Sequence, residues 1–300
     1  MNQRINTDFS ACGINLYLLR SYCAWRKQQL IFTNQLYDML TFWLDKELSD
    51  SANTSCFKSI DDVFALSGRE VSSGKCSRML LVEHEGRNYY VKLSERGGVR
   101  LRRWLGKSRI ETEFLNLRRF NSWGLSCPRV LVFALQKRFG FFRRAALITE
   151  PIDMALDLVQ WAEQRPTQFD DAQWLHKVST QLADACRQMH KRNFAHGDLK
   201  WRNILVQENE SAQVYFIDCP DGRFWRWPFM GYRIVKDLAC LDKVGKKVLS
   251  KTQRLRFFMQ YRQEKNLIPK AKSNYVKCCV FLKAGSKEWF KCTAIPQTMM

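Results

Sequence analysis

The sequence predicts an α+β fold of two lobes: a small lobe with an antiparallel sheet and one helix, then a larger, mainly helical lobe. Three observations predict it. Two short apolar runs flank a glycine turn within residues 79–93, as in a β-hairpin. A single apolar repeat at helical spacing follows at 110–120. Longer helical repeats then occupy 172–190 and 234–264, and 300 residues suffice for a core in each lobe.

The small lobe is expected over residues 59–150, and its central hairpin contains an unusual lysine. Strands are expected at 79–82 and 88–93, joined by a turn that contains Gly86. Lys92 lies inside the second apolar strand, where an ammonium group is costly to bury without a partner. A partner is therefore expected nearby.

The helix that follows offers two acidic partners for Lys92. Glu113 leads directly into the apolar repeat and is the expected partner, and Glu111 is the weaker alternative. The helix is expected to end at Gly124.

The large lobe is expected over residues 151–264. Strands at 130–135 and 145–152 lead into it, and Glu150 stands at the expected hinge, directly before a proline. A long amphipathic helix over 172–190 then delivers the chain to its most informative segment.

That segment is His196-Gly197-Asp198, followed by Asn203 and by an apolar run that ends at Asp218. Phosphoryl transfer consists mostly of positioning and charge neutralisation: an aspartate accepts the hydroxyl proton, and hard oxygen ligands hold Mg²⁺. The pattern therefore predicts a bilobal protein-kinase-like fold with Asp198 as catalytic base and Asn203 and Asp218 on Mg²⁺. Gly197 replaces the protein-kinase arginine, as in small-molecule, sugar and atypical protein kinases. We interpret His196 as structural.

A kinase-like site also needs a strand lysine paired with a helix glutamate, and a loop that covers the phosphates of ATP. Lys92 and Glu113 occur in the required order. The loop is expected within 66–78, around Ser73 and Gly74, where small and hydroxylated residues stand in place of G-x-G-x-x-G. Backbone N–H groups of such a loop can bind phosphates.

Each of these residues has an ordinary alternative explanation when taken alone. Asp198 and Asn203 are both common in turns, Lys92 could extend from an edge strand to water, and a lone histidine is usually packed. The joint order of lysine, glutamate, His-Gly-Asp, asparagine and aspartate favours the kinase-like interpretation.

The formal net charge of +20 is unevenly distributed. Residues 223–300 contain 18 Lys or Arg and 4 acids, a net of +14. Such a field attracts polyanions, among which phosphorylated glycans and anionic membranes are expected and nucleic acid is not. Segment 223–233 interleaves aromatic residues with arginine, which predicts peripheral contact with a membrane surface; packing against the large lobe is an equal alternative.

The 11 cysteines show neither C-x-x-C nor zinc-ligand spacing, which predicts reduced thiols and a cytoplasmic protein. Neither a transmembrane run nor a signal peptide is expected. Residues 1–58 are expected to form a helical extension, with one amphipathic helix predicted by apolar residues at 32, 36, 40 and 43–44. Residues 265–300 are expected to be a basic tail.

The chain resembles the bacterial lipopolysaccharide kinase family, the Kdo/WaaP and InaA-like group, over about residues 66–262. The resemblance is carried by Tyr89–Leu93, Glu113–Phe120, Leu147–Ile152, the His196 loop, Tyr215–Asp218, and Lys236–Leu241 with Arg254–Phe258.

The resemblance implies ATP-dependent phosphorylation of a sugar, Kdo or heptose, in the lipopolysaccharide inner core. The expected partner is this core or another anionic glycolipid, met at the cytoplasmic face of the inner membrane. The resemblance implies Lys92 on the ATP phosphates, Glu113 as its partner, Asp198 as base, and Mg²⁺ on Asn203 and Asp218. Ser73, Gly74 and Glu150 complete the expected cofactor contacts.

One departure from the family pattern follows Asp218. Cys219-Pro220 stands where the family more often has an aromatic residue and another acid, which Asp221 could supply. Two other functions stay open: an atypical protein kinase, and a non-catalytic kinase-like module that binds an anionic partner. The complete set of lysine, base and metal ligands argues against the second.

Overall fold

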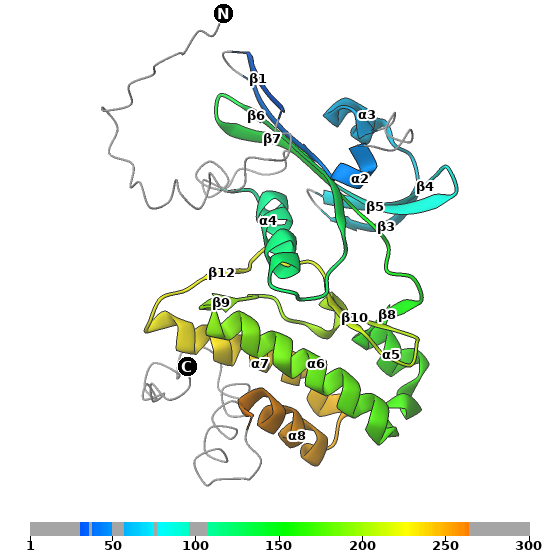
Figure 1. Cartoon of the computed structure of the whole chain (residues 1–300), viewed down its shortest axis with the longest axis vertical. Coiled ribbons are helices and arrows are strands. Elements are labelled where there is room, and N and C mark those ends of the chain that lie inside the picture. Colours follow the sequence, from blue (N-terminus) through cyan, green and yellow to red (C-terminus); the bar gives the residue numbers. More distant parts are fainter. Residues whose placement is uncertain (1–30, 36–37, 50–56, 75–76, 96–106, 264–300) are drawn as a thin grey trace, which may run out of the picture.

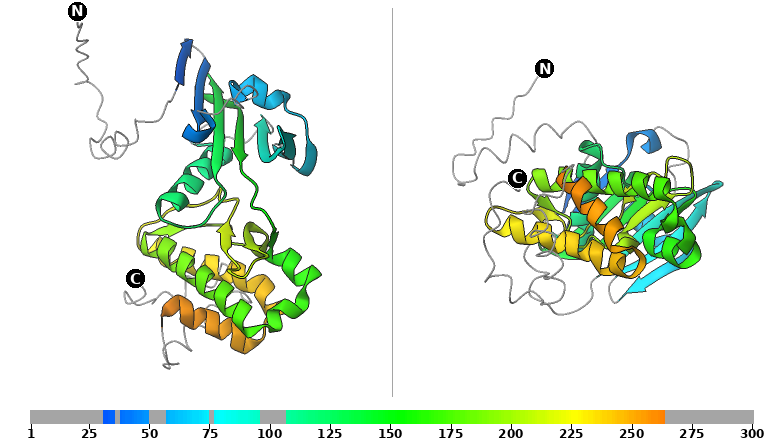
Figure 2. Two further views of the ribbon diagram at one scale, coloured as in Figure 1. Left: turned by 45° about the vertical axis from the view of Figure 1, so that its right-hand side comes forward. Right: turned by 90° about the horizontal axis from the view of Figure 1, so that it is seen from below.

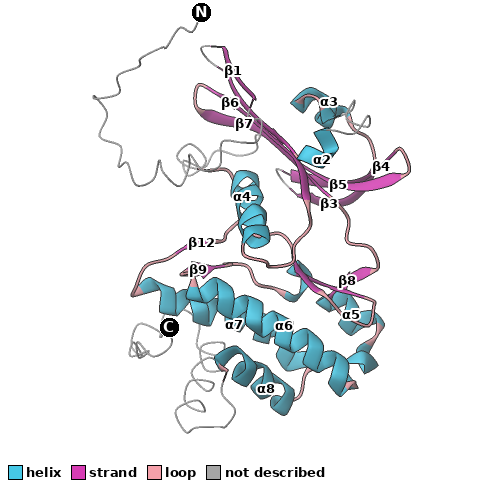
Figure 3. Cartoon of the chain, in the orientation of Figure 1, coloured by secondary structure: helices cyan, strands magenta, loops and turns pink. Residues whose placement is uncertain are grey.

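The computed structural model describes residues 31–35, 38–49, 57–74, 77–95 and 107–263. Within them the chain has the expected α+β architecture: a sheet with helix α4 (Arg109–Ser122) forms one lobe, and a body of helices forms the other (Figures 1 and 3). Residues 1–30 and the expected basic tail lie outside the described residues.

The described small lobe is built on one antiparallel sheet with strand order β1-β2-β6-β7-β5-β4-β3. Alternation along β5 explains its two faces: Tyr89, Val91 and Leu93 are buried in the small-lobe core, and Lys92 points to the opposite face. The strands are β1 (Ile31–Gln35), β2 (Asp38–Leu44), β3 (Arg69–Gly74), β4 (Ser77–His84), β5 (Arg87–Glu95), β6 (Val130–Arg138) and β7 (Phe141–Thr149).

The prediction of an amphipathic helix near residues 32–44 is wrong. This segment forms strands β1 and β2, which extend the small-lobe sheet. In β2, Phe42 and Trp43 are both buried on opposite faces, Phe42 in the small-lobe core and Trp43 against Phe114 of α4. A strand covered on both faces loses its period of two, so its apolar residues imitated helical spacing.

Helix α4 begins at a capping box. The Ser108 hydroxyl accepts from the Glu111 backbone N–H, and the Glu111 carboxylate accepts from the backbone of Ser108. One turn later, Glu113 and Phe114 lie on the buried face of the helix. Figure 2 shows α4 between the sheet and the helical body, so its buried face meets both lobes.

The large lobe is organised around α6 (Ala172–Lys191), which Asp171 caps and which buries Val178, Leu182 and Met189. Two small sheets, β12-β9 and β11-β10-β8, flank residues 196–203, the segment between β9 and β10. The other elements are α2 (Lys46–Ser49) and α3 (Ile60–Ala65) of the small lobe, and β8 (Ala155–Asp157), α5 (Leu158–Gln164), η3 (Pro166–Asp170), β9 (Phe194–Ala195), η4 (Trp201–Asn203), β10 (Ile204–Gln207), β11 (Val214–Phe216), β12 (Arg223–Phe224), α7 (Phe229–Val248) and α8 (Lys251–Arg262).

Two hydrophobic cores support these lobes. One lies on the outer face of the sheet under α3, and the larger one runs from α4 into the helical body. Among the described residues, no helix combines the length and the apolar character needed to cross a bilayer.

Candidate active site

The inner face of the sheet carries an ion-pair network that joins the two lobes. Nζ of Lys92 lies 2.9 and 2.7 Å from the two carboxylate oxygens of Glu113, and 2.7 Å from Oδ1 of Asp218. Glu113 therefore meets Lys92 as expected. Glu111 does not, because its carboxylate caps α4 and lies 3.5 Å from Lys137.

Contacts within the network shift the pKa values of Lys92 and Asp218 in the directions that favour their charged forms. Burial alone would lower the pKa of Lys92, but the charges of Glu113 and Asp218 outweigh it and raise that pKa above its ordinary value. Burial would likewise raise the pKa of Asp218, but the Lys92 ammonium outweighs it and holds that pKa below its ordinary value. Glu113 differs from these two: burial outweighs the charge of Lys92 and raises the pKa of this carboxyl above its ordinary value.

The loop of residues 196–203, called the catalytic loop after its predicted role, runs between β9 and β10. It brings the predicted base together with the predicted amide ligand. Nδ2 of Asn203 donates to the backbone carbonyl of Asp198 at 2.9 Å and to its Oδ2 at 3.3 Å. Nζ of Lys200 lies 2.5 Å from Oδ1 of Asp198. Lys200 is not among the residues predicted from the sequence, although it stands only two residues after Asp198.

Asp218 is brought beside this loop through the backbone. The N–H of Ile217 donates to the carbonyl of Asn203 at 3.0 Å, next to the paired strands β10 and β11. Among the described residues there is no cluster of three or more histidine, cysteine or acidic residues that could hold a metal alone. The oxygens of Asn203 and Asp218 fit Mg²⁺, which usually takes its remaining ligands from substrate phosphates and water.

A buried carboxylate on α7 holds the start of the catalytic loop. The two oxygens of Asp237 accept from the backbone N–H groups of His196, at 2.7 Å, and Gly197, at 2.9 Å. His190 lies 3.4 Å from the same carboxylate and 2.8 Å from the Tyr261 hydroxyl. In the sequence, Asp237 stands out only as part of the family-like stretch Lys236–Leu241. Its contacts with His196 and Gly197 depend on the packing of α7 and could not be predicted from the sequence.

The His196 ring packs between lobes, as the structural interpretation expects. It is fully buried and stacks on Phe120 of α4, with ring centroids 6.0 Å apart, and contacts Phe216. Burial lowers the pKa of His196, so the ring is neutral at physiological pH.

The departure after Asp218 is accommodated by a turn fastened to α4. Asp218 has a positive φ of 55°, and Nδ2 of Asn116 donates to the carbonyls of Cys219, at 2.8 Å, and Gly222, at 2.9 Å. A Cβ on Gly222 would lie 2.4 Å from the Cys219 sulfur, so only glycine fits there. Asp221 pairs with Arg109, at 3.1 Å.

The remaining predicted residues lie at the edges of the site. Ser73 and Gly74 end β3, exposed and paired with the start of β4, one hairpin before Lys92. Residues 75–76 lie outside the described residues. Glu150 follows β7 at the connection between lobes, where its backbone N–H donates to the backbone carbonyl of Arg129 at 3.0 Å. The hydrogen bonds that join Lys92 to Glu113 and Asp218 do not involve Glu150.

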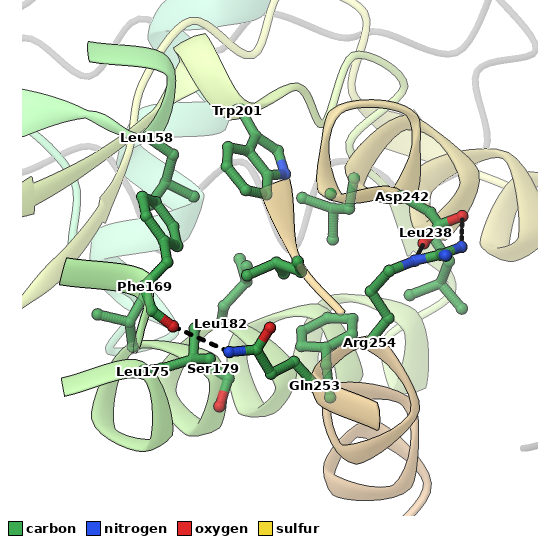
Figure 4. Close-up of a pocket in the computed structure, with 15 residues that line it drawn as sticks. Leu158, Phe169, Leu175, Ser179, Leu182, Trp201, Leu238, Asp242, Gln253 and Arg254 are labelled. Carbon is green, nitrogen blue, oxygen red and sulfur yellow. Dashed lines mark hydrogen bonds and ion pairs between the residues drawn. The ribbon is translucent and has the colours of Figure 1, made fainter. Parts of the chain in front are cut away.

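An apolar cavity lies against the catalytic loop inside the large lobe (Figure 4). Trp201, directly after Lys200, forms one wall, and the paired side chains of Asp242 and Arg254, 2.5 Å apart, form another. Leu158, Phe169, Leu182, Leu238 and Leu249 line much of the rest.

A family model described as "Lipopolysaccharide kinase (Kdo/WaaP) family" matches residues 63–261, more than half of the chain. Proteins named 3-deoxy-D-manno-octulosonic acid kinase are similar over shorter stretches. The protein of Pasteurella multocida is 33% identical over 114 residues, 38% of this chain and 44% of the relative. That of Vibrio cholerae is 30% identical over 112 residues, 37% and 43% of the two chains.

The matched stretches therefore span less than half the length of these curated relatives. Among solved structures, "WaaP in complex with acyl carrier protein" aligns with a TM-score of 0.56 at 19% identity, over 74% of this chain and 89% of that one. At this identity the likeness shows a shared fold.

Proposed function

Since the chain belongs to the lipopolysaccharide kinase (Kdo/WaaP) family, we propose that it is an ATP-dependent kinase that phosphorylates a sugar of the lipopolysaccharide inner core. The observation that carries the proposal is the network of Lys92, Glu113 and Asp218, joined through the backbone to the loop of Asp198 and Asn203. A module that only binds an anion has no use for this combination of a cation, a base and two metal ligands.

Each group has a chemical task in this proposal. Lys92, oriented by Glu113, binds the ATP phosphates, and Asn203 and Asp218 hold Mg²⁺, which neutralises the charge that develops on the phosphates. Asp198 accepts the proton of the attacking sugar hydroxyl. The carboxylate of Asp198 contacts Lys200, and in this proposal the Lys200 ammonium neutralises charge on the transferred phosphate.

We infer Kdo, 3-deoxy-D-manno-octulosonic acid, as the acceptor sugar in preference to heptose. The support is the name shared by the relatives that are 33% and 30% identical to this chain. Because the acceptor is a glycolipid and ATP is intracellular, the enzyme is expected at the cytoplasmic face of the inner membrane, as a peripheral protein.

The test is the mass of core lipopolysaccharide from cells with and without this protein. The expected result is the loss of one phosphate unit, restored by the parent chain and not by Asp198→Asn. A purified acceptor that carries a single Kdo should then gain one phosphate in vitro. Unchanged lipopolysaccharide mass together with phosphorylation of a protein acceptor would move the chain to the atypical protein kinases.

A further inference from the structure

The stretch that links the turn after Asp218 to α7 exposes aromatic rings and arginines side by side. Phe224, Trp227 and Phe229 expose 53%, 68% and 58% of their surface, whereas large apolar residues are normally covered. Arg223 and Arg226 alternate with them and are also exposed. We call these five residues, Arg223, Phe224, Arg226, Trp227 and Phe229, the aromatic–arginine ridge.

Trp225 does not belong to the ridge. Its ring is covered by the Arg233 guanidinium, 3.7 Å from the ring centroid, and its backbone N–H donates to the carbonyl of Asn193 at 2.8 Å. The alternative of packing against the large lobe thus applies to Trp225, while its neighbour Trp227 is left in water.

The ridge is attached directly to the catalytic machinery. In strand β12, Arg223 and Phe224 pair with Ala195 and Phe194 of β9, and the next residue after β9 is His196 of the catalytic loop. In Figures 1 and 2, β12 and the start of α7 lie at the margin of the large lobe, on the side of α4. A surface that touches the ridge therefore lies beside the loop that carries Asp198.

The positive charge of the ridge favours a negatively charged partner. Residues 222–236 contain four basic side chains and no acid, and arginine stays charged at any physiological pH. Aromatic rings favour the interface between headgroups and hydrocarbon, and arginines favour anionic headgroups. We propose that the aromatic–arginine ridge docks this chain on an anionic phospholipid surface; this deepens the proposed function, which supplies the membrane-anchored acceptor.

The test is co-sedimentation of the full chain with vesicles, without ATP or acceptor, so that it does not depend on the kinase activity. Vesicles of 70% phosphatidylcholine and 30% phosphatidylglycerol are compared with pure phosphatidylcholine, at about 0.1 M and about 0.5 M salt. Parent binding should require phosphatidylglycerol and should fall steeply with salt, because the screening length shrinks to a few ångströms.

Two ridge variants and one matched control decide which surface binds. Arg223→Gln/Arg226→Gln should weaken binding about 30-fold, since each arginine near an anionic surface contributes about fivefold. Trp227→Ala/Phe229→Ala should weaken it by roughly tenfold or more, through lost apolar burial. Arg138→Gln/Phe139→Ala removes another exposed arginine–aromatic pair, at the β6–β7 turn, and should bind like the parent.

Thermal unfolding should be unchanged in all three variants, which excludes misfolding. The proposal is overturned if the ridge variants bind like the parent, if neutral vesicles bind equally well, or if the parent does not bind vesicles. Ridge-dependent binding to a soluble acidic protein, with no vesicle binding, would make the ridge a protein-docking surface instead. Failure of the lipopolysaccharide mass test with intact vesicle binding would refute only the proposed function.

Discussion

At the residue scale, the site consists of charges held in place by neighbours. Lys92 touches two carboxylates, and Asp198 touches Lys200 and Asn203, so each charged group has a partner before ATP arrives. In the proposed function, these contacts divide the site into a base for the acceptor and a network for the nucleotide.

Substitution of the two aspartates should separate these tasks. Asp198→Ala should lower kcat by about 10²–10⁴, the scale of general-base catalysis, and leave ATP binding nearly intact. Asp218→Asn should instead raise the KM for Mg·ATP, because it removes a charged metal ligand. Steady-state kinetics with varied Mg·ATP measure both, and parent-like rates in both variants would reject the assigned roles.

Substitutions of Lys92 and of its partner Glu113 should reduce turnover to different degrees. Lys92→Met should nearly abolish turnover, whereas Glu113→Gln should be less severe, because the lysine can still reach phosphate without its partner. Glu111→Gln is the matched control on the same helix, since Glu111 caps α4 and does not contact Lys92. Equal loss in the Glu111 and Glu113 variants would point to general disruption of α4.

The Lys92–Asp218 pair makes a prediction about pH. The pKa of Asp218 is lowered, so its stabilising contribution is complete above the unfolded value of about 3.9 and is lost as pH falls through the folded value. The pKa of Lys92 is raised, so its contribution is lost only as pH rises above about 10.4. The difference in unfolding free energy between parent and Asp218→Asn should shrink in acid, as pH falls through the folded pKa of Asp218; Glu113, whose pKa burial raises, adds its own change above that window. A difference that stays the same in acid would contradict this account.

At the scale of elements, α4 and α7 each hold one part of the site. Helix α4 carries Glu113 and, one turn later, Asn116, which binds the turn after Asp218. Helix α7 carries Asp237, which binds the two amides at the start of the catalytic loop. Lys92, the turn after Asp218 and the loop that carries Asp198 are thereby positioned by two helices.

Asp237→Asn tests the anchor on α7. An amide offers one acceptor oxygen, so one of the N–H groups of His196 and Gly197 loses its partner, which costs about 1–3 kcal/mol. We expect kcat to fall about tenfold or more, since tenfold corresponds to about 1.4 kcal/mol of barrier. Asp242→Asn, on the same helix, breaks the pair with Arg254 and should lower stability with little effect on kcat. Parallel losses of kcat in the two variants would remove the special role of Asp237.

At the scale of the whole molecule, ion pairs in the described residues join the two lobes, among them Lys92–Asp218 and Arg109–Asp221, and ATP is expected to bind between the lobes. Lys92 and Glu113 belong to the small lobe and Asp218 to the large one, so their network is a connection between lobes. A ligand that binds the same groups adds its own binding energy to that connection.

Mg·ATP should therefore stabilise the folded chain. At 100 times its Kd a ligand contributes about 2.7 kcal/mol, which corresponds to a rise in Tm of about 5 °C or more for a protein of this size. ATP with EDTA should give a smaller rise, and Asp218→Asn should reduce the difference between the two conditions. Scanning calorimetry measures each; identical Tm values with and without Mg²⁺ would exclude a metal contribution.

The sequence by itself determined the two-lobed class and the candidate residues Lys92, Glu113, Asp198, Asn203 and Asp218. It could do so because the chemistry needs these residue types in a definite order, and because hairpins and amphipathic helices leave short periodic signals. The burial of Lys92 in an apolar strand predicted a partner for the same reason, since an unpaired buried charge is too costly.

Only the tertiary structure decided what depends on contacts between distant segments. Strands β1 and β2 extend the small-lobe sheet because β6 pairs with β2, a contact between segments far apart in the sequence that no local pattern predicts. Asp237 and Asn116 became site residues only when α7 and α4 were laid against the loops they bind. Trp225 and Trp227 look alike in sequence; one is covered by Arg233 and the other is exposed, because burial is a property of the assembled surface and not of the residue.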